Sequence, residues 1–177
     1  ELHIFSGIEM DILPDASLDF SNDFLQELDY VIAAIHSNFN QSEDKIMQRL
    51  FAALENPYVN VIAHPTGRLI GRRDGYQVDV DKLIQKAKET GTVLELNANP
   101  NRFDLSHQWV KQAQEIGVPI VINTDAHSYR TLEYMDIGVT VARKGWLKKE
   151  SVINTWPKEK LMELFSSKRL KGVTTDE

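Results

Sequence analysis

The chain alternates short apolar runs with longer amphipathic runs, and this alternation limits its possible folds more than any other feature. The short runs are rich in β-branched residues and bounded by polar residues or glycine, which is typical of buried parallel strands. They cover residues 30–35, 59–63, 93–96 and 119–123, with further candidates at 8–13 and 137–142.

Helical periodicity appears between the strand-like runs. It predicts helices over residues 42–54, 80–90, 106–116 and 158–167. Gly91 and Gly117 stand where C-terminal helix caps belong. Strand–helix alternation at this spacing predicts an α/β domain with parallel strands and right-handed crossovers, either a barrel or an open doubly wound sheet.

Composition narrows the classes of function. A length of 177 residues fits about one domain, and no apolar stretch approaches the roughly 20 residues of a membrane helix. There is no cysteine, so any metal must be held by His, Asp and Glu. The net charge of −6 argues against a stand-alone nucleic-acid binder but not against an enzyme that holds phosphate through metal ions. The sequence contains no glycine-rich nucleotide-binding motif.

Polar side chains cluster at the ends of the predicted strands. Inside the first strand, or soon after the later ones, stand Glu9, His36, His64, Asn97, Asn99, Asp125 and His127. In parallel α/β folds the carboxyl ends of the strands meet at one face, where ligands bind. Imidazole and carboxylate together suit zinc, manganese or iron rather than calcium. Asp125 and His127 are two residues apart, so in an extended segment both could face one cluster.

A basic loop follows His64 and contains Arg68, Arg72 and Arg73. Arginine presents a bidentate fork to phosphate oxygens, so one interpretation is that the loop binds substrate phosphate. The alternative is a surface loop with no role in binding. Asn97 and Asn99 have two interpretations as well, because they could contact substrate or cap the next helix.

Five segments, in this order, resemble motifs of the PHP (polymerase and histidinol phosphatase) domain, a metal-dependent phosphoesterase. They are GIEMDIL at 7–13, AIHS at 34–37, AHPTGR at 63–68, ELNANP at 95–100 and NTDAHS at 123–128. The match runs over nearly the whole chain. Residues 64–76, 97–102 and 143–147 look most like the PHP domain at the C-terminus of bacterial family X DNA polymerases.

The resemblance implies a distorted (βα)7 TIM-like barrel with up to three zinc or manganese ions at its C-terminal face. Glu9 would bridge two of the ions, and His36 and His64 would complete the second. Asp125 would bind the first ion and His127 the third. Glu9 and Asp125 would be the catalytic carboxylates, while Arg68, Arg72, Arg73, Asn97 and Asn99 would bind substrate.

This chain departs from the family pattern at its start. The family opens with a His-x-His strand, and His3 does not stand in such a motif. We therefore expect residues 1–177 to be the C-terminal portion of a single PHP domain from a longer protein, without the first barrel strands. Such a piece is expected to be inactive alone and to associate through its exposed barrel edge.

The function that the resemblance implies is hydrolysis of DNA phosphodiesters by metal-activated water. It would be a 3′-5′ exonuclease or end-processing activity in DNA repair, in a cytoplasmic polymerase that also carries a nucleotidyltransferase domain and binds DNA but no membrane. One alternative is a phosphatase acting on a small phosphate monoester such as histidinol phosphate. Another is a non-catalytic PHP module that supports a polymerase domain.

Overall fold

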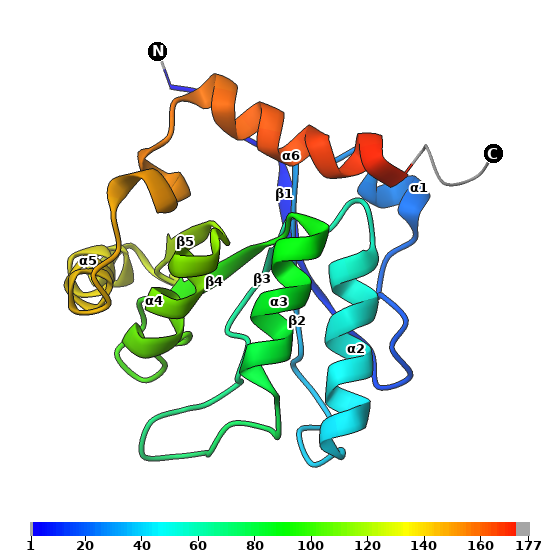
Figure 1. The fold of residues 1–177 in the computed structure, drawn as a ribbon, viewed down its shortest axis with the longest axis horizontal. Coiled ribbons are helices and arrows are strands. Elements are labelled where there is room, and N and C mark those ends of the chain that lie inside the picture. The colour runs from blue at the N-terminus through cyan, green and yellow to red at the C-terminus, as the bar shows by residue number, and fades with distance from the viewer. Residues whose placement is uncertain (1, 173–177) are drawn as a thin grey trace.

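A computed structural model describes residues 2–172 as an α/β fold with one five-stranded parallel sheet. The strands are β1 (Gly7–Asp11), β2 (Tyr30–Ala34), β3 (Val61–Ile62), β4 (Val93–Asn97) and β5 (Ile120–Asn123). They lie side by side in chain order (Figure 1), an arrangement consistent with part of a TIM-like barrel. Within residues 2–172, β1 and β5 do not pair with each other.

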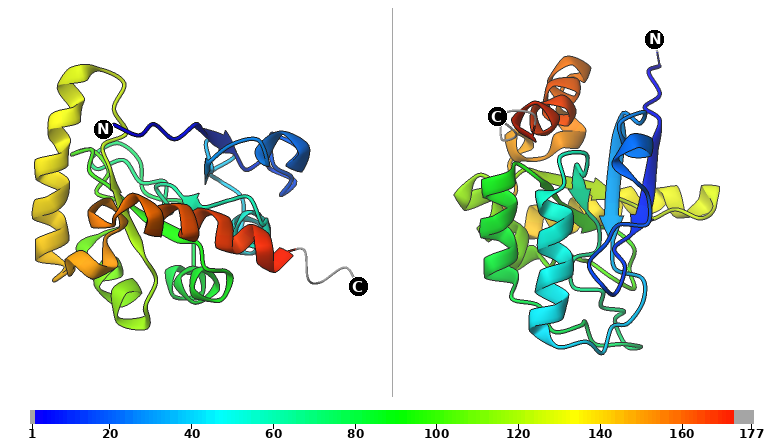
Figure 2. Two further views of the ribbon diagram at one scale, coloured as in Figure 1. Left: turned by 90° about the horizontal axis from the view of Figure 1, so that it is seen from above. Right: turned by 90° about the vertical axis from the view of Figure 1, so that its right-hand side faces the viewer.

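Six helices accompany the sheet. They are α1 (Asn22–Leu25), α2 (Glu43–Glu55), α3 (Val80–Thr90), α4 (His107–Ile116), α5 (Tyr134–Lys144) and α6 (Lys158–Gly172), with short 3-10 turns at Tyr129–Glu133, Lys149–Ser151 and Ile153–Thr155. Helices α2 and α3 stand next to each other on one side of the sheet, while α6 runs across one end of the molecule (Figures 1 and 2). In the described part of the chain, no helix combines the length and apolar character needed to cross a membrane.

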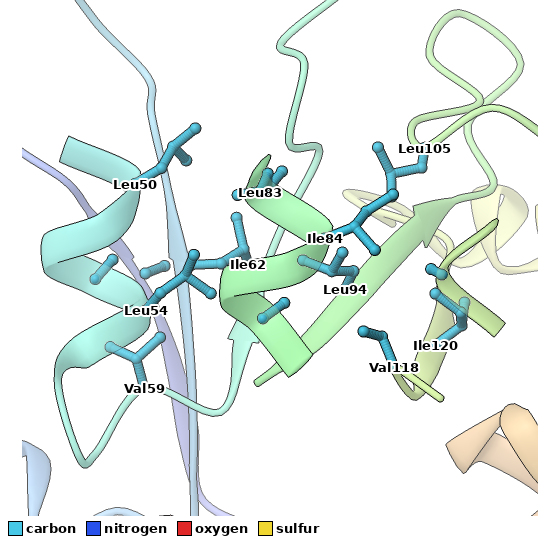
Figure 3. Packing of buried hydrophobic residues seen from close by; sticks show 14 of the residues in the cluster. Leu50, Leu54, Val59, Ile62, Leu83, Ile84, Leu94, Leu105, Val118 and Ile120 are labelled. Carbon is cyan, nitrogen blue, oxygen red and sulfur yellow. The ribbon is translucent and has the colours of Figure 1, made fainter. Parts of the chain in front are cut away.

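The core lies on both faces of the sheet because successive strand residues point to opposite sides. The larger cluster packs β-strand residues such as Ile62 and Leu94 against Leu50 of α2 and Ile84 of α3 (Figure 3). The smaller cluster lies on the other face and consists of Val61, Val93, Val121, Ile153 and Phe165. We call the second face the inner face, and the same alternation directs Glu9 and Glu95 toward it.

The predicted strands and helices are largely confirmed, with one error. Residues 137–142 form part of α5 rather than a strand. The buried positions of this segment are Gly138 and Ala142, four residues apart, which is the spacing of a helix face. A Cβ at Gly138 would lie 2.6 Å from the Cβ of Ala98, so glycine allows the helix to approach the sheet closely. Helix α1 and the 3-10 turns were not predicted.

Helix α6 is fastened to the N-terminal ends of β3 and β4, opposite the predicted ligand residues. The buried ammonium of Lys168 donates to the Val59 carbonyl and to Thr92 Oγ1, each at 2.8 Å. The Asn60 side chain accepts from the Val31 N–H at 2.9 Å and donates to the Phe165 carbonyl at 3.2 Å. These contacts tie the end of the chain to the middle of the sheet.

The buried position of Lys168 predicts a pH-dependent stability. Burial lowers the pKa of Lys168 from 10.5 to about 7 because it disfavours the ammonium form. Between these values the unfolded chain binds more protons, so stability should rise with pH, by at most about 1.4 kcal/mol per unit. Lys168→Met removes this dependence. Urea unfolding from pH 7 to 9.5 should show the variant losing stability relative to wild type as pH rises, and a constant difference would contradict this assignment.

Candidate metal centre

Three predicted ligand residues converge at the C-terminal ends of β1, β2 and β3. Glu9 projects from β1, whereas His36 and His64 stand in the loops that follow β2 and β3. Glu9 Oε1 lies 3.2 Å from His36 Nε2 and 3.1 Å from His64 Nε2, and one ligand atom from each residue lies within 4.8 Å of the others. The two imidazole rings are 5.2 Å apart between centroids. Two imidazoles and one carboxylate form a donor set that could hold a divalent metal ion and leave coordination positions open.

The carboxylate of Glu9 and the neighbouring imidazoles each stabilise the charged form of the other. Hydrogen bonds from His36 and then His64 hold the pKa of Glu9 far below its usual range, so the carboxylate stays ionised. The hydrogen bond to Glu9 raises the pKa of His36, and Asp11 adds to the increase, while desolvation opposes it. His64 is buried, whereas His36 and Glu9 have side chains 40% and 38% exposed. The group is therefore open to solvent on the side of β1 and β2.

Asp11 is a member of this environment that sequence reasoning missed. It follows Glu9 by two residues on the same strand, so both side chains lie on the same face. Its Oδ1 is hydrogen-bonded to His36 Nδ1, the ring nitrogen that does not face Glu9. A carboxylate on the far nitrogen is the usual partner of a metal-binding histidine, because it fixes ring orientation and tautomer. The Glu-x-Asp spacing within a strand was the signal that could have identified it.

The ends of β3 and β5 carry unusual backbone conformations. His64 has φ +29° and Asp125 has φ +53°, in the region that non-glycine residues rarely adopt. The backbone N–H of His64 donates to Glu95 Oε2 at 2.7 Å, and Glu95 is buried on the inner face of β4. Burial raises the pKa of Glu95 to about 7, against the opposing influence of His64 and Asn123. Sequence reasoning missed Glu95, although it is the acidic residue in an otherwise apolar run, Val93–Leu96.

Asp125 and His127 lie apart from the three converging ligands. Asp125 Oδ2 is paired with Arg102 Nε at 3.2 Å and accepts from Asn97 Nδ2 at 3.3 Å. The His127 side chain is 87% exposed, and its Nδ1 is 2.9 Å from the Asp125 carbonyl oxygen. Among residues 2–172, the cluster that could hold a metal comprises Glu9, His36 and His64.

The basic loop is largely held by its own arginines. Arg68 donates to the carbonyls of Arg102, at 2.8 Å, and Phe103. Arg73 donates to the Gly67 carbonyl at 2.7 Å and stacks over the ring of Phe39, 4.0 Å from its centroid. Both guanidinium groups therefore support the loop, and their expected contact with substrate stays a prediction.

Arg72 differs from the other two arginines because it is exposed. Together with Arg68 and Arg73 it lines a hollow of about 470 Å³ formed by residues 68–75. Of the three arginines, Arg72 is the best placed to meet a ligand from solution.

The two predicted asparagines have local partners. Asn97 is fully buried, and its amide donates to Glu95 and Asp125, so direct contact with substrate is closed to it in this structure. Asn99 Oδ1 accepts from the N–H of Asn101 at 3.0 Å, which closes the turn after β4. Asn99 is half-buried. The amide of Asn97 positions carboxylates instead of lining an open site.

Comparison with known proteins relates the chain to a protein named DNA polymerase/3′-5′ exonuclease and to probable phosphatases. No family model matches it. It is 58% identical over 151 residues to DNA polymerase/3′-5′ exonuclease PolX of Bacillus subtilis, a match that covers 85% of this chain and 26% of that protein. It is 29% identical over 168 residues to a probable phosphatase of Thermoanaerobacter sp., covering 87% of this chain and 64% of that protein. These matches are consistent with the resemblance of the chain to PHP domains.

The chain also resembles a probable phosphatase of Caldanaerobacter subterraneus, with 28% identity over 180 residues, 95% of this chain and 67% of that protein. It thus spans about a quarter of PolX and about two thirds of the phosphatases it matches. Likeness to both groups supports a phosphoesterase and leaves the size of the substrate to be decided by experiment.

Proposed function

We propose that this chain is the metal-dependent phosphoesterase part of a bacterial family X DNA polymerase and removes nucleotides from DNA 3′ ends. The observation that carries the proposal is the convergence of Glu9, His36 and His64 in a chain 58% identical to a protein named DNA polymerase/3′-5′ exonuclease. DNA would be the partner of the full-length protein, and a role in DNA repair in the cytoplasm would follow from that substrate.

Glu9, His36 and His64 would hold a zinc or manganese ion. A divalent ion in such a site supplies a water nucleophile activated at neutral pH and offsets negative charge on the phosphoryl group. The carboxylate of Glu9 keeps this end of the sheet negative, and Asp11 holds the His36 ring with Nε2 toward Glu9. Asp125 and His127 are proposed to serve further ions, up to three in all. Arg102 restrains the Asp125 carboxylate through Nε.

The test of this function is an assay of the full-length protein with manganese or zinc on a 3′-labelled oligonucleotide. Stepwise shortening from the 3′ end that requires metal is the expected result. Release of phosphate from histidinol phosphate, without shortening of DNA, would favour the phosphatase alternative suggested by the 29% identical relatives. No turnover of either substrate, with intact polymerisation, would indicate a non-catalytic module.

Arg72→Ala tests the role of the basic loop in substrate binding. The side chain is exposed at the rim of the loop, so its loss should raise KM for DNA with little change in stability. The salt dependence should become shallower by about one unit of slope, because one phosphate contact fewer releases about one counterion fewer. Arg68→Ala should instead destabilise the loop, since Arg68 is bonded to backbone carbonyls. An unchanged salt slope in Arg72→Ala would remove this arginine from the binding site.

A further inference from the structure

Glu95 is surrounded by hydrogen-bond donors from three strand ends. It is 3% exposed in the middle of the sheet, on β4. Its Oε2 accepts from the backbone N–H of His64 at 2.7 Å and from Asn97 Nδ2 at 3.2 Å. Its Oε1 accepts from Asn123 Nδ2 at 2.8 Å. One carboxylate therefore joins the residue after β3, the end of β4 and the end of β5.

The hydrogen-bond network continues from Glu95 to Asp125, another predicted metal ligand. Asn97 Nδ2 lies 3.2 Å from Glu95 Oε2 and 3.3 Å from Asp125 Oδ2, so one amide group faces both carboxylates. The side-chain oxygen of Asn97, Oδ1, accepts from the Asn99 N–H at 3.0 Å, which fixes the orientation of the amide. A continuous path of hydrogen bonds through Glu95 and Asn97 thus links His64 with Asp125.

The two residues at the ends of this path both have left-handed backbones, as do four other non-glycine residues of the described chain. His64 has φ +29° and Asp125 has φ +53°, and neither is glycine. Such conformations persist when the surroundings over-determine them, and they concentrate at functional sites. The His64 N–H bond to Glu95 is a contact of this kind, because the backbone of the strained residue makes it, and the Asn97 amide holds the carboxylate of Asp125.

We propose that Glu95 is a positioning residue that sets the places of His64 and Asp125 for metal binding. The inference rests on the proposed function and adds to it a buried residue that contacts no substrate. The site requires a carboxylate at this position, since all three partners of Glu95 donate a hydrogen bond to it. A glutamine would turn an N–H₂ group toward at least one of these donors.

Glu95→Gln is the direct test, with Asn60→Asp as a matched control. Both changes exchange a carboxylate and a carboxamide at a buried position of nearly unchanged volume. Asn60 lies at the opposite end of the sheet, where it bonds Val31 and Phe165 rather than ligand residues. The measurements are the dissociation constant of Co²⁺, its visible absorption spectrum when bound, and the urea midpoint of the metal-free chain.

We expect Glu95→Gln to weaken Co²⁺ binding by about 10- to 100-fold and to change the cobalt spectrum, as loss of outer ligand support does. Asn60→Asp should lower the urea midpoint and leave affinity and spectrum unchanged. Wild-type affinity with an unchanged spectrum in Glu95→Gln would overturn the proposal, and so would an equal loss of affinity in Asn60→Asp. If Glu95→Gln does not fold, Asn123→Ser removes one donor to Glu95 and should weaken binding several-fold, while an unchanged affinity overturns the proposal.

His36→Ala separates failure of this inference from failure of the proposed function. If wild type and His36→Ala bind Co²⁺ equally, the metal centre itself is wrongly assigned. If His36→Ala loses Co²⁺ while Glu95→Gln binds normally, the metal centre stands and the positioning role of Glu95 is wrong.

Discussion

His36→Ala is expected to weaken divalent-metal binding by about 100-fold or more, because it removes one of three converging ligands. Glu9 and His64 remain, and two protein ligands rarely hold such an ion tightly. The loss should be read as a dissociation constant by competition with a chromogenic chelator. In the full-length protein, the same change should abolish exonuclease activity and spare polymerisation. The His36 ring is 40% exposed, so the folded state should survive the substitution.

Two further variants provide a scale for the loss of metal affinity in His36→Ala. Asp11→Asn keeps the size of the side chain that contacts His36 Nδ1 and removes its charge, so a weaker loss of about 10-fold is expected. His107→Ala is the matched control, since His107 is the first residue of α4 and stands outside the converging group. Metal affinity should fall in the order His107→Ala, Asp11→Asn, His36→Ala. Wild-type binding by His36→Ala would remove this group from consideration as a metal centre.

The fold class was predictable because period and length separate strands from helices. Runs such as Val93–Leu96 are too short and too apolar for an amphipathic helix, and α3 was predicted with its observed bounds because Gly91 ends it in a left-handed conformation. Residues 137–142 misled the prediction because β-branched residues are common there, whereas the burial of Gly138 and Ala142 decides the helix. That burial depends on a neighbouring sheet, which the local sequence does not show.

The candidate site was predictable only where strand ends alone determine position. Parallel strands in chain order bring the residues after β2 and β3 next to β1, and the structure accordingly gathers His36, His64 and Glu9. Asp11 and Glu95 were missed because their importance lies in hydrogen bonds to His36 and His64. Those bonds depend on side-chain direction across neighbouring strands.

The arginines of the basic loop also have contacts that the sequence alone does not show. Their number suggested a phosphate site, and in the structure Arg68 and Arg73 bond to backbone carbonyls of the loop and its neighbour. Charge counted along a sequence does not distinguish a guanidinium group that faces a ligand from one that supports its own loop. Exposure separates Arg72 from the other two.

Asp125→Ala and His127→Ala in the full-length protein are each expected to reduce exonuclease activity on the order of 10³-fold while polymerisation continues. The proposal gives both residues to additional metal ions, and the nucleophile is a water that no side chain replaces. Asp125 also pairs with Arg102 at 3.2 Å, so its loss leaves the Arg102 guanidinium without this carboxylate and should reduce stability as well as activity.

His127 gives the cleaner test of the two. Its side chain is 87% exposed, and its Nδ1 lies 2.9 Å from a backbone carbonyl oxygen, so His127→Ala should leave the unfolding midpoint unchanged. Tyr129→Ala is the matched control, because Tyr129 is 76% exposed two residues further along the same loop. A loss of activity in His127→Ala, with normal activity in Tyr129→Ala and equal stability in both, would indicate chemistry at His127 rather than a disturbed loop. Normal exonuclease rates for His127→Ala with added manganese would exclude His127 from the catalytic centre. The proposed ligands that do not depend on this result would then be Glu9, His36 and His64.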